Sequence, residues 1–243
     1  MKNAVIILAA GKGTRMQSDI PKVLHKLKGK TLLERVIITS NKLLCKKIIV
    51  VIGYKKEILK NELKKFKNVE YAVQKEQNGT AHAVKMCFEN LKNFEGNVII
   101  LSGDVPLISA NTLMGLLNAK INTNSKASVL TSVVDNPVGY GRIVRNISGN
   151  LNKITEHKDC NETELKINEI NAGIYVIENK YLKKYIPKIK NNNSQSEYYL
   201  PDLINLMISD SIPVSIFKTI NNREICGINS KEQLADLEKF VND

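Results

Sequence analysis

The first hundred residues alternate uninterrupted apolar segments with stretches of helical periodicity. The segments at 3–9, 47–53 and 97–104 read NAVIILA, KIIVVIG and NVIILSGD, and a shorter one at 69–73 reads VEYAV. Between them, 31–44, 54–66 and 80–91 space their apolar residues three and four apart, as a helix requires. Segments that are apolar throughout predict parallel strands covered on both faces. The chain is therefore expected to form an α/β fold with helices on both sides of the sheet.

After residue 120 the pattern changes to more strands with fewer helices between them. Strands are expected at 127–134, 141–147, 151–157, 168–178 and 214–218. Helices are expected at 198–209, with Pro201 in the first turn, and at 230–242, with Ser230 as the cap. With 243 residues, one large domain is more natural than two small ones. We expect a single, mixed but mostly parallel sheet, with a domain at 1–229 and a C-terminal helix at 230–243.

A glycine-containing loop follows the first strand, within VIILAAGKGTRMQSDIPKVLHKL. In open parallel sheets, ligands bind outside the carboxyl ends of the strands, which is where this loop is expected. Glycines let backbone N–H groups approach phosphate oxygens without a Cβ in the way. Arg15 and Lys22 would then offset the charge of a triphosphate. Taken alone, Gly-x-Gly also fits a simple tight turn between a strand and a helix.

Two better-known phosphate-binding loops do not match. GKGTRM has methionine where the dinucleotide fingerprint has its third glycine, and the second strand ends in VVIGYKK, without an acidic residue for a ribose. The P-loop pattern of glycine, four residues and then Gly-Lys-Ser/Thr is also absent from the sequence.

The longer pattern LAAGKGTRM followed by PKVLH resembles the signature of the sugar nucleotidyltransferases, or pyrophosphorylases. Within that family, GTRMQSDIPKVLHKL is similar to the amino-terminal domain of bacterial N-acetylglucosamine-1-phosphate uridylyltransferases. Further motifs follow in the family's order: QKEQNGTAHA, GDVPLI, GYGRI, EHKD, EINAGIY, NNNSQSEYYLPD and GINSKEQL. The resemblance covers essentially the whole chain. It implies a Rossmann-like nucleotidyltransferase domain that transfers UMP from UTP to N-acetyl-α-D-glucosamine 1-phosphate and releases pyrophosphate.

The resemblance also implies roles for individual residues. It implies that Lys22, Arg15 and Asp104 are catalytic. It also implies that Asp104 and Asn229 bind Mg²⁺. The residues implied to bind the nucleotide are Leu8, Ala9, Ala10, Gly11, Gly13, Arg15, Lys22, Gln74, Gly79 and Thr80. The residues implied to bind the sugar are Ser102, Gly103, Gly141, Glu156, Asn171, Glu197 and Tyr199.

Residue chemistry supports some of these roles and leaves others open. Asp104 follows an apolar strand, and a hard carboxylate there suits Mg²⁺, but the residue would also suit a turn. Asn229 and Thr80 could each be explained as a helix cap instead. Glu156 could be explained as an acidic residue on the surface. Gln74 offers a donor and an acceptor to the imide edge of uracil, and a polar loop alone does not explain it.

Three residues depart from the family pattern. Ala172 stands where threonine is common, Ser102 where tyrosine is frequent, and Pro201 where threonine occurs in EYYLTD. These changes affect the surroundings of the α-phosphate and the sugar. They remove no charged group that the mechanism needs.

The net charge of +12 would suit nucleic acid, a membrane surface or acidic small molecules. The excess is mostly lysine dispersed among other polar residues, and aromatic residues make up only 5%. We therefore expect small-molecule substrates and no nucleic acid. No apolar stretch is long enough to cross a membrane, and the start enters a strand directly. The four cysteines form no C-x-x-C pair, which suits reduced thiols in a cytoplasm.

Other expectations concern what the chain lacks. Relatives commonly continue into a left-handed β-helix that acetylates glucosamine 1-phosphate and forms trimers, but no hexapeptide repeat is present here. We therefore expect no acetyltransferase domain and no trimer. His25, His82 and His157 have no nucleophile at a telling spacing, so a hydrolase triad is not expected. The alternatives are transfer to another sugar or from another nucleotide, such as glucose 1-phosphate or dTTP, a nucleotide-sugar-binding protein without turnover and, third, a basic nucleic-acid binder.

Overall fold

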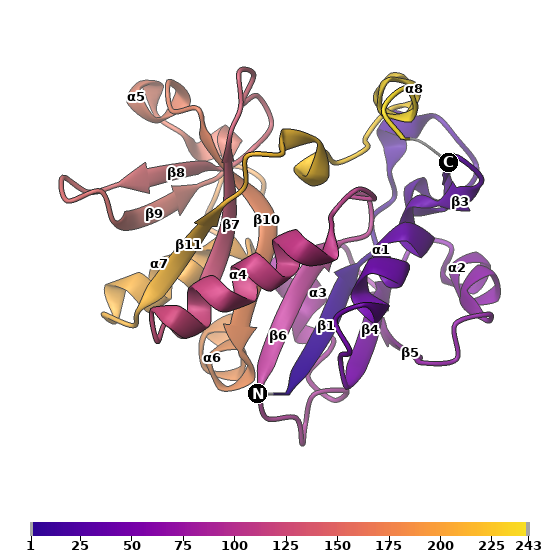
Figure 1. Ribbon diagram of the computed structural model, residues 1–243, viewed down its shortest axis with the longest axis horizontal. Coiled ribbons are helices and arrows are strands. Elements are labelled where there is room, and N and C mark those ends of the chain that lie inside the picture. The colour runs from indigo at the N-terminus through magenta and orange to yellow at the C-terminus, as the bar shows by residue number, and fades with distance from the viewer. Residues whose placement is uncertain (1, 242–243) are drawn as a thin grey trace.

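The computed structural model describes residues 2–241, and within them nine strands form one open sheet (Figure 1). The main path runs β11 (Val214–Lys218), β7 (Ala127–Val133), β10 (Glu169–Glu178), β6 (Asn97–Ser102), β1 (Asn3–Leu8), β4 (Lys47–Ile52) and β5 (Val69–Val73). β8 (Arg142–Arg145) pairs with β10 and with β9 (Leu151–Thr155), while β2 (Lys26–Leu27) and β3 (Lys30–Thr31) form a separate small sheet. The expected mixed sheet is confirmed.

One strand runs against the direction of the rest of the main path. β1 is parallel to β4 and β6, β4 to β5, and β7 to β11. β10 is antiparallel to both β6 and β7, so it joins two parallel sets that point the same way. The amino end of β10 therefore lies at the edge of the sheet where β6 and β7 have their carboxyl ends.

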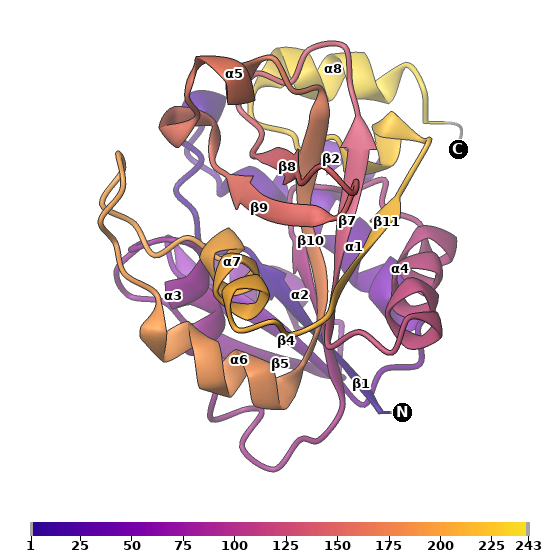
Figure 2. The ribbon, with the colours of Figure 1, turned by 90° about the vertical axis from the view of Figure 1, so that its left-hand side faces the viewer.

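Helices cover both faces of the sheet, as the apolar strands predict (Figure 2). The helices are α1 (Leu32–Asn41), α2 (Lys56–Leu63), α3 (Thr80–Lys85), α4 (Ala110–Asn122), α5 (Glu162–Leu165), α6 (Asn179–Tyr185), α7 (Pro201–Ser209) and α8 (Lys231–Glu238). Along β1, Ala4 and Ile6 belong to the core with α3, α6 and α7. Val5 and Ile7 belong to the opposite core with α1, α2 and α4. This alternation buries β1 on both faces.

Local signals in the sequence fix several helix starts. Thr31 and Glu34 form a reciprocal capping box at the start of α1. Ser109 accepts a hydrogen bond from the Thr112 N–H at the start of α4, and Ser230 accepts one from the Gln233 N–H at the start of α8. Ser230 thus caps the C-terminal helix as expected.

Some helix boundaries differ from the expectation. The segment expected to be helical over 80–91 is α-helical only to Lys85, and the turns that follow are closed by tighter hydrogen bonds, from the Cys87 N–H to the Val84 carbonyl and from the Phe88 N–H to the Lys85 carbonyl. Pro201 does open α7, but α7 covers only 201–209 of the expected helix. α8 ends at Glu238, and residue 242 of the expected C-terminal helix lies outside the described residues. The boundary proposed at residue 229 stays a prediction.

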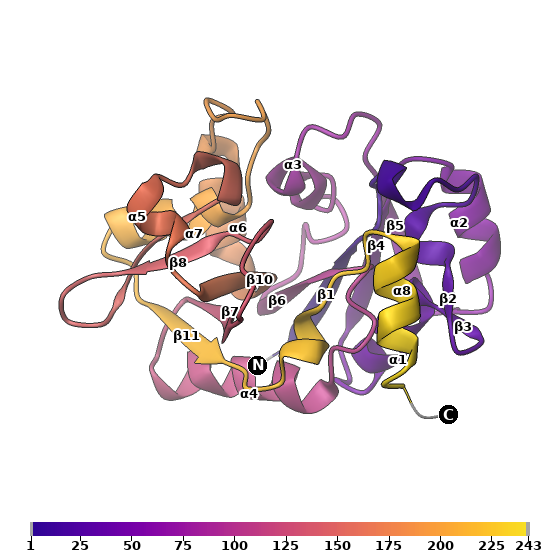
Figure 3. The same cartoon turned by 90° about the horizontal axis from the view of Figure 1, so that it is seen from above.

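The loop after β1 and the segment that carries α8 lie at the same edge of the sheet (Figure 3). A short helix, η1 (Thr14–Met16), follows β1, and α8 lies across this edge. A small apolar cluster that includes Met16, Leu27, Ile228 and Leu237 fixes α8 to the loop after β1. Among residues 2–241, no helix is long and apolar enough to span a bilayer.

Candidate active site

The candidate site lies at the carboxyl ends of β1 and β6, which are neighbours in the sheet. Leu8 pairs with Ser102, and the Gly103 N–H donates a hydrogen bond to the Leu8 carbonyl over 2.9 Å. A Cβ on Gly103 would lie only 3.2 Å from that same carbonyl oxygen. The glycine therefore lets the chain leave β6 tightly against β1, which brings Asp104 to the loop after the first strand.

The loop after β1 depends on Gly13. This residue has φ = 62°, and a Cβ on it would lie 2.5 Å from the Cβ of Lys22. A side chain at position 13 is thus disfavoured by both backbone conformation and contact. Met16, which is buried, anchors the same loop in the cluster under α8. The loop is consequently folded back onto Lys22 rather than extended into solvent.

Lys22, Asp104, Asn229 and Arg15 converge on one point. The Lys22 ammonium contacts the Asp104 carboxylate and lies 2.9 Å from the Asn229 side-chain oxygen. A guanidinium nitrogen of Arg15 also lies 2.9 Å from that oxygen of Asn229. These four residues come from the loop after β1, the end of β6 and the segment before α8. The sequence motifs therefore meet in space despite more than two hundred residues between the first and the last.

The Asp104 carboxylate is held on its second oxygen as well. The Ser102 hydroxyl donates a hydrogen bond of 2.6 Å to Asp104 Oδ1. The backbone also ties the two halves of the site together, since the Ile228 N–H donates to the Asp104 carbonyl over 2.9 Å. Ser102, expected near the sugar, therefore orients the Asp104 carboxylate in addition to lining the cavities described next.

A cavity of about 240 Å³ opens beside this cluster. It is lined by Leu8, Ala9, Ala10, Gly11, Lys22, Val23, Gln74, Gln77, Gly79, Thr80, Ala83, Ser102, Asp104 and Glu197. Most residues expected to bind the nucleotide thus line one cavity, whereas Gly13 and Arg15 lie outside its lining. Glu197, which was expected near the sugar, lines this cavity instead.

Gln74 and the start of α3 form the far wall of the first cavity. The Gln74 side chain is only 3% exposed, and its nitrogen donates to the Gly79 carbonyl over 3.1 Å. Gly79 has φ = 104°, and a Cβ there would lie 2.5 Å from the Tyr198 carbonyl oxygen. Gly79 occupies the cap position of α3, so Thr80 is the first helical residue and not the cap. The Thr80 hydroxyl accepts a hydrogen bond from the Leu200 N–H.

A second cavity of about 230 Å³ continues from the first. Both are lined by Leu8, Thr80, Ser102 and Asp104, so they form one continuous cleft. Besides Ser102, three more of the residues expected to bind the sugar line the second cavity, namely Gly141, Glu156 and Asn171. A Cβ on Gly141 would lie 3.6 Å from both Glu156 Oε1 and Asn171 Cβ, which shows how closely the three are grouped.

Asn171 is positioned by an irregularity in β10. The pairing register with β7 shifts between Asn171 and Tyr175, and Gly173 has φ = 70°. Asn171 accepts a hydrogen bond from the Gly173 N–H and donates one of 2.6 Å to the buried Tyr175 hydroxyl. Ala172, one of the departures, also lines the second cavity.

Glu156 is in an unusual electrostatic environment. Burial raises the pKa of Glu156 to about 7, and the negative charges of Asp202, Asp159 and Glu197 add to the effect. Burial also raises the pKa of Asp202. The sequence analysis did not single out Asp202 or Asp159, although both lie in motifs that it identified, YYLPD and EHKD. Carboxyl groups close together and away from water favour retention of a proton.

Tyr199 lies elsewhere than expected. It is buried, its hydroxyl accepts a hydrogen bond of 2.8 Å from the Gln195 amide, and it lines a neighbouring cavity of about 630 Å³. Glu156 lines both this cavity and the second one, and so it lies between them. Tyr199 therefore stands behind Glu156 rather than beside Gly141 and Asn171.

The donor set at the convergence point fits a hard divalent cation. Asp104 supplies a carboxylate oxygen and Asn229 an amide oxygen, and both already contact one cation, the Lys22 ammonium. Among residues 2–241, no cluster of three or more His, Cys, Asp and Glu side chains is arranged for a metal. Two oxygen ligands are nevertheless enough for Mg²⁺, which keeps water and phosphate in its remaining positions.

An open α/β sheet with a glycine-containing loop and an aspartate at adjacent strand ends is typical of proteins that bind phosphorylated ligands at this edge. The chain belongs to the nucleotidyl transferase family, whose sequence model matches residues 4–221. It is 44% identical over 243 residues to the bifunctional protein GlmU of Geobacillus thermodenitrificans, covering 100% of this chain and 52% of that protein. It is 45% identical over 236 residues to GlmU of Thermoanaerobacter pseudethanolicus, covering 97% and 51%.

The chain therefore spans about half the length of the curated relatives that it matches. Its fold is also similar to a solved UDP-glucose pyrophosphorylase in complex with UDP-glucose. The TM-score is 0.78 with 19% sequence identity, over 99% of this chain and 98% of the other. The α/β nucleotidyltransferase fold expected from the sequence is thus confirmed.

Proposed function

We propose that the chain transfers UMP from UTP to N-acetyl-α-D-glucosamine 1-phosphate, giving UDP-N-acetylglucosamine and pyrophosphate. The observation that carries this proposal is the convergence of Lys22, Asp104 and Asn229 on a cleft that joins two cavities. The full-length similarity to the first half of GlmU proteins supports the choice of substrates.

The two cavities suit the two substrates. UTP binds in the first, with its base toward Gln74 and its phosphates toward Gly11 and Lys22. The sugar phosphate binds in the second, with its sugar toward Glu156 and Asn171. Because the cavities adjoin at Asp104, the reacting phosphate groups meet beside the charged cluster.

The reaction needs positioning and charge stabilisation more than proton transfer. An oxygen of the sugar phosphate attacks the α-phosphorus of UTP and forms a new P–O bond. The bond between the α-phosphorus and the oxygen that bridges it to the β-phosphorus breaks, and pyrophosphate leaves. The attacking phosphate is already largely dianionic at neutral pH, so no general base is required. Lys22 stabilises negative charge on the α-phosphoryl group, while Arg15 and the loop after β1 hold the departing pyrophosphate.

Asp104 and Asn229 would hold Mg²⁺, which when bound neutralises charge on the substrate phosphates. The same two oxygens hold the Lys22 ammonium in this structure. Lys22 therefore has to leave them as it turns toward the phosphate. The Ser102 hydroxyl, which donates to Asp104 Oδ1, keeps the carboxylate in place during this exchange.

Pyrophosphate release over a matrix of substrates tests the proposal. UTP, dTTP and CTP are combined with N-acetylglucosamine 1-phosphate and glucose 1-phosphate, each with and without Mg²⁺. The highest kcat/KM is expected for UTP with N-acetylglucosamine 1-phosphate, and no turnover is expected after EDTA treatment. A preference for another substrate pair would contradict the proposed substrates but not the proposed type of reaction. Binding of UDP-sugars without turnover would contradict the enzymatic activity and indicate a binding protein.

A further inference from the structure

We propose that His82 is a positioning residue that fixes the Gln74 amide for reading the uracil base, and that it does so as a neutral imidazole protonated on Nε2. The inference rests on the proposed function, because it concerns the base of the same nucleotide. His82 lies within the motif QKEQNGTAHA, but neither the sequence analysis nor the reaction chemistry gives it a role.

The Gln74 amide nitrogen has two neighbours. It lies 3.1 Å from the Gly79 carbonyl oxygen and 3.2 Å from His82 Nδ1. A carbonyl oxygen can only accept, so the amide group facing Gly79 must be the NH₂ end. The reverse orientation would place two oxygens against each other in a buried position, where Gln74 is 3% exposed. The Gly79 carbonyl therefore determines which end of the amide points which way.

This orientation sets the protonation of His82. An amide NH₂ group has two hydrogens to donate and accepts nothing, so His82 Nδ1 must present its lone pair. The imidazole is then neutral and carries its hydrogen on Nε2. A hydrogen on Nδ1 would face the amide hydrogens, and the Gln74 side chain would lose one of its two fixed partners.

The opposite end of the amide is left for the ligand. No residue among 2–241 donates a hydrogen bond to the Gln74 side-chain oxygen, and that oxygen is not among the inaccessible side-chain atoms that lack a partner. Gln74 lines the first cavity, where this accessible oxygen would serve as the acceptor for the base. Uracil carries a hydrogen on N3 of its imide, whereas cytosine has a lone pair at that position. An acceptor held in this orientation therefore selects the imide base.

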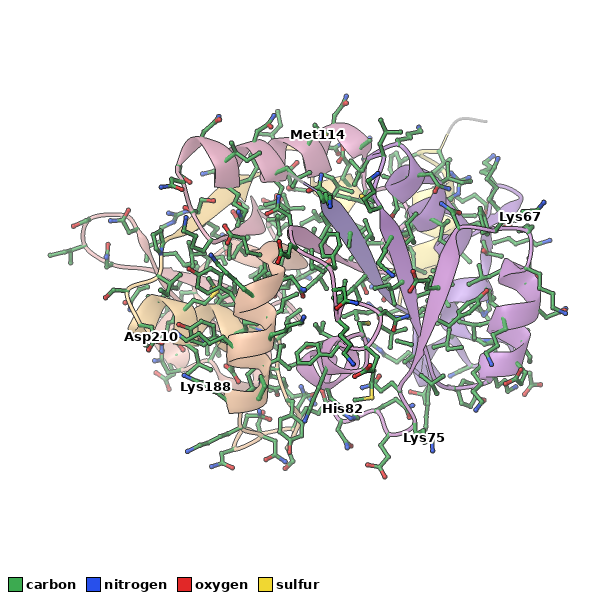
Figure 4. The ribbon with its side chains drawn as sticks, turned by 90° about the horizontal axis from the view of Figure 1, so that it is seen from below. Lys67, Lys75, His82, Met114, Lys188 and Asp210 are labelled. Carbon is green, nitrogen blue, oxygen red and sulfur yellow. The ribbon has the colours of Figure 1, made fainter. Side chains whose placement is uncertain are left out.

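His82 is held in place independently of the ligand. It belongs to α3, whose preceding Gly79 packs under the Tyr198 backbone, and the His82 and Tyr198 rings have centroids 6.5 Å apart. Figure 4 shows His82 on α3, near the segment that carries Lys75, next to Gln74 in the chain. The pair Gln74–His82 is thus assembled by the fold before any nucleotide binds.

Three variants in α3 test this role. His82→Leu keeps a branched side chain but removes the acceptor, and its KM for UTP is expected to rise about tenfold, the scale of one lost hydrogen bond. The preference for UTP over CTP should fall, while kcat and the KM for the sugar phosphate stay within about threefold. His82→Asn returns an oxygen to the position of Nδ1 and should restore most of the UTP affinity. Lys85→Leu, an exposed change in the same helix, is the control.

Two measurements do not depend on turnover. Nitrogen-15 NMR of the imidazole in the full chain should show a hydrogen on Nε2 and a lone pair on Nδ1. Calorimetry should show weaker UTP binding in His82→Leu and recovery in His82→Asn. A hydrogen on Nδ1, or unchanged UTP binding in His82→Leu, would overturn the positioning role. Absence of pyrophosphate release by the unmodified chain would instead overturn the proposed function, so the two failures are distinguishable.

Discussion

The Lys22 ammonium contacts the Asp104 carboxylate and, at 2.9 Å, the side-chain oxygen of Asn229. These are the two oxygens that we propose as magnesium ligands. Both side chains of the ion pair are shielded, with 17% of Lys22 and 14% of Asp104 exposed. A lysine and a divalent ion therefore compete for one pair of oxygens, and the competition makes the first prediction.

Removal of the Lys22 ammonium should have opposite effects on metal binding and on turnover. Lys22→Met is expected to bind Mg²⁺ more tightly without substrate, because no internal cation has to leave Asp104. Its turnover should fall by about 10²–10³-fold, the scale of losing one preorganised charge partner. Calorimetric titration with Mg²⁺ and steady-state kinetics measure the two effects. Lys12→Met, an exposed change in the same loop, is the control, and weaker metal binding in Lys22→Met would contradict the competition.

Loss of the Ser102 hydroxyl should loosen the Asp104 carboxylate. The bond is 2.6 Å long and goes to a charged acceptor, so its removal is expected to cost about 1.5–3 kcal/mol locally. We expect Ser102→Ala to need more Mg²⁺ for half-maximal activity and to turn over about tenfold more slowly. Ser128→Ala is a matched control in β7, because the Ser128 hydroxyl is buried without a partner. Equal magnesium dependence in both variants would speak against this role.

Ionisation of Glu156 should destabilise the fold as the pH rises. Burial, with help from the nearby carboxylates, raises the pKa of Glu156 to about 7 from its ordinary 4.5. The folded state then retains a proton that the unfolded state has lost, so the associated stability is full below pH 4.5 and disappears as the pH approaches and passes 7. Glu156→Gln should therefore gain stability relative to the unmodified chain over this interval, by up to about 3 kcal/mol.

Urea unfolding at pH 4.5 and pH 8 measures this difference. The gain of Glu156→Gln should be larger at the higher pH, while its KM for the sugar phosphate becomes worse. A constant difference at both pH values would mean that Glu156 titrates normally. Residues of enzyme active sites commonly lower the stability of the folded protein, and this pattern is expected for Glu156.

Two glycines of the loop after β1 should respond differently to alanine. Gly13 has a left-handed backbone, and an added Cβ would collide with Lys22, so Gly13→Ala is expected to lower stability by about 1–2 kcal/mol and to impair turnover. At Gly11, nothing in the structure lies within 4 Å of an added Cβ. Gly11→Ala should thus keep its thermal stability and lose only UTP affinity. Thermal unfolding and UTP titration separate the two; an equal loss of stability would refute this distinction.

Local patterns predicted much of this molecule. The apolar strands and the Ser230 cap lie where expected, because their signals are contained in a few neighbouring residues. The helix α4 was missed although Leu113, Leu116, Leu117 and Lys120 form its buried side. The buried Lys120 interrupts the apolar pattern, and its partner Glu178, 3.1 Å away, lies far along the chain.

The site was predictable only in part. The motifs identified Lys22, Asp104 and Asn229 as candidates, but their contacts depend on how α8 packs against the loop after β1. The positions of Glu197 and Tyr199 depend on the loop before α7, which crosses the start of α3. The contact between the Gln74 and His82 side chains joins residues that are close in sequence. It nevertheless depends on the turn at Gly79, which the sequence alone does not predict.

The reversed strand β10 has a consequence for how specificity can diverge. Asn171 enters the cleft from the beginning of a strand, whereas Ser102 enters it from the end of the neighbouring one. In the proposed arrangement of substrates, the sugar and the phosphates are therefore contacted by strands that run in opposite directions. If this proposal holds, substitutions at the start of β10 should change the preferred sugar without altering the proposed triphosphate-binding loop after β1.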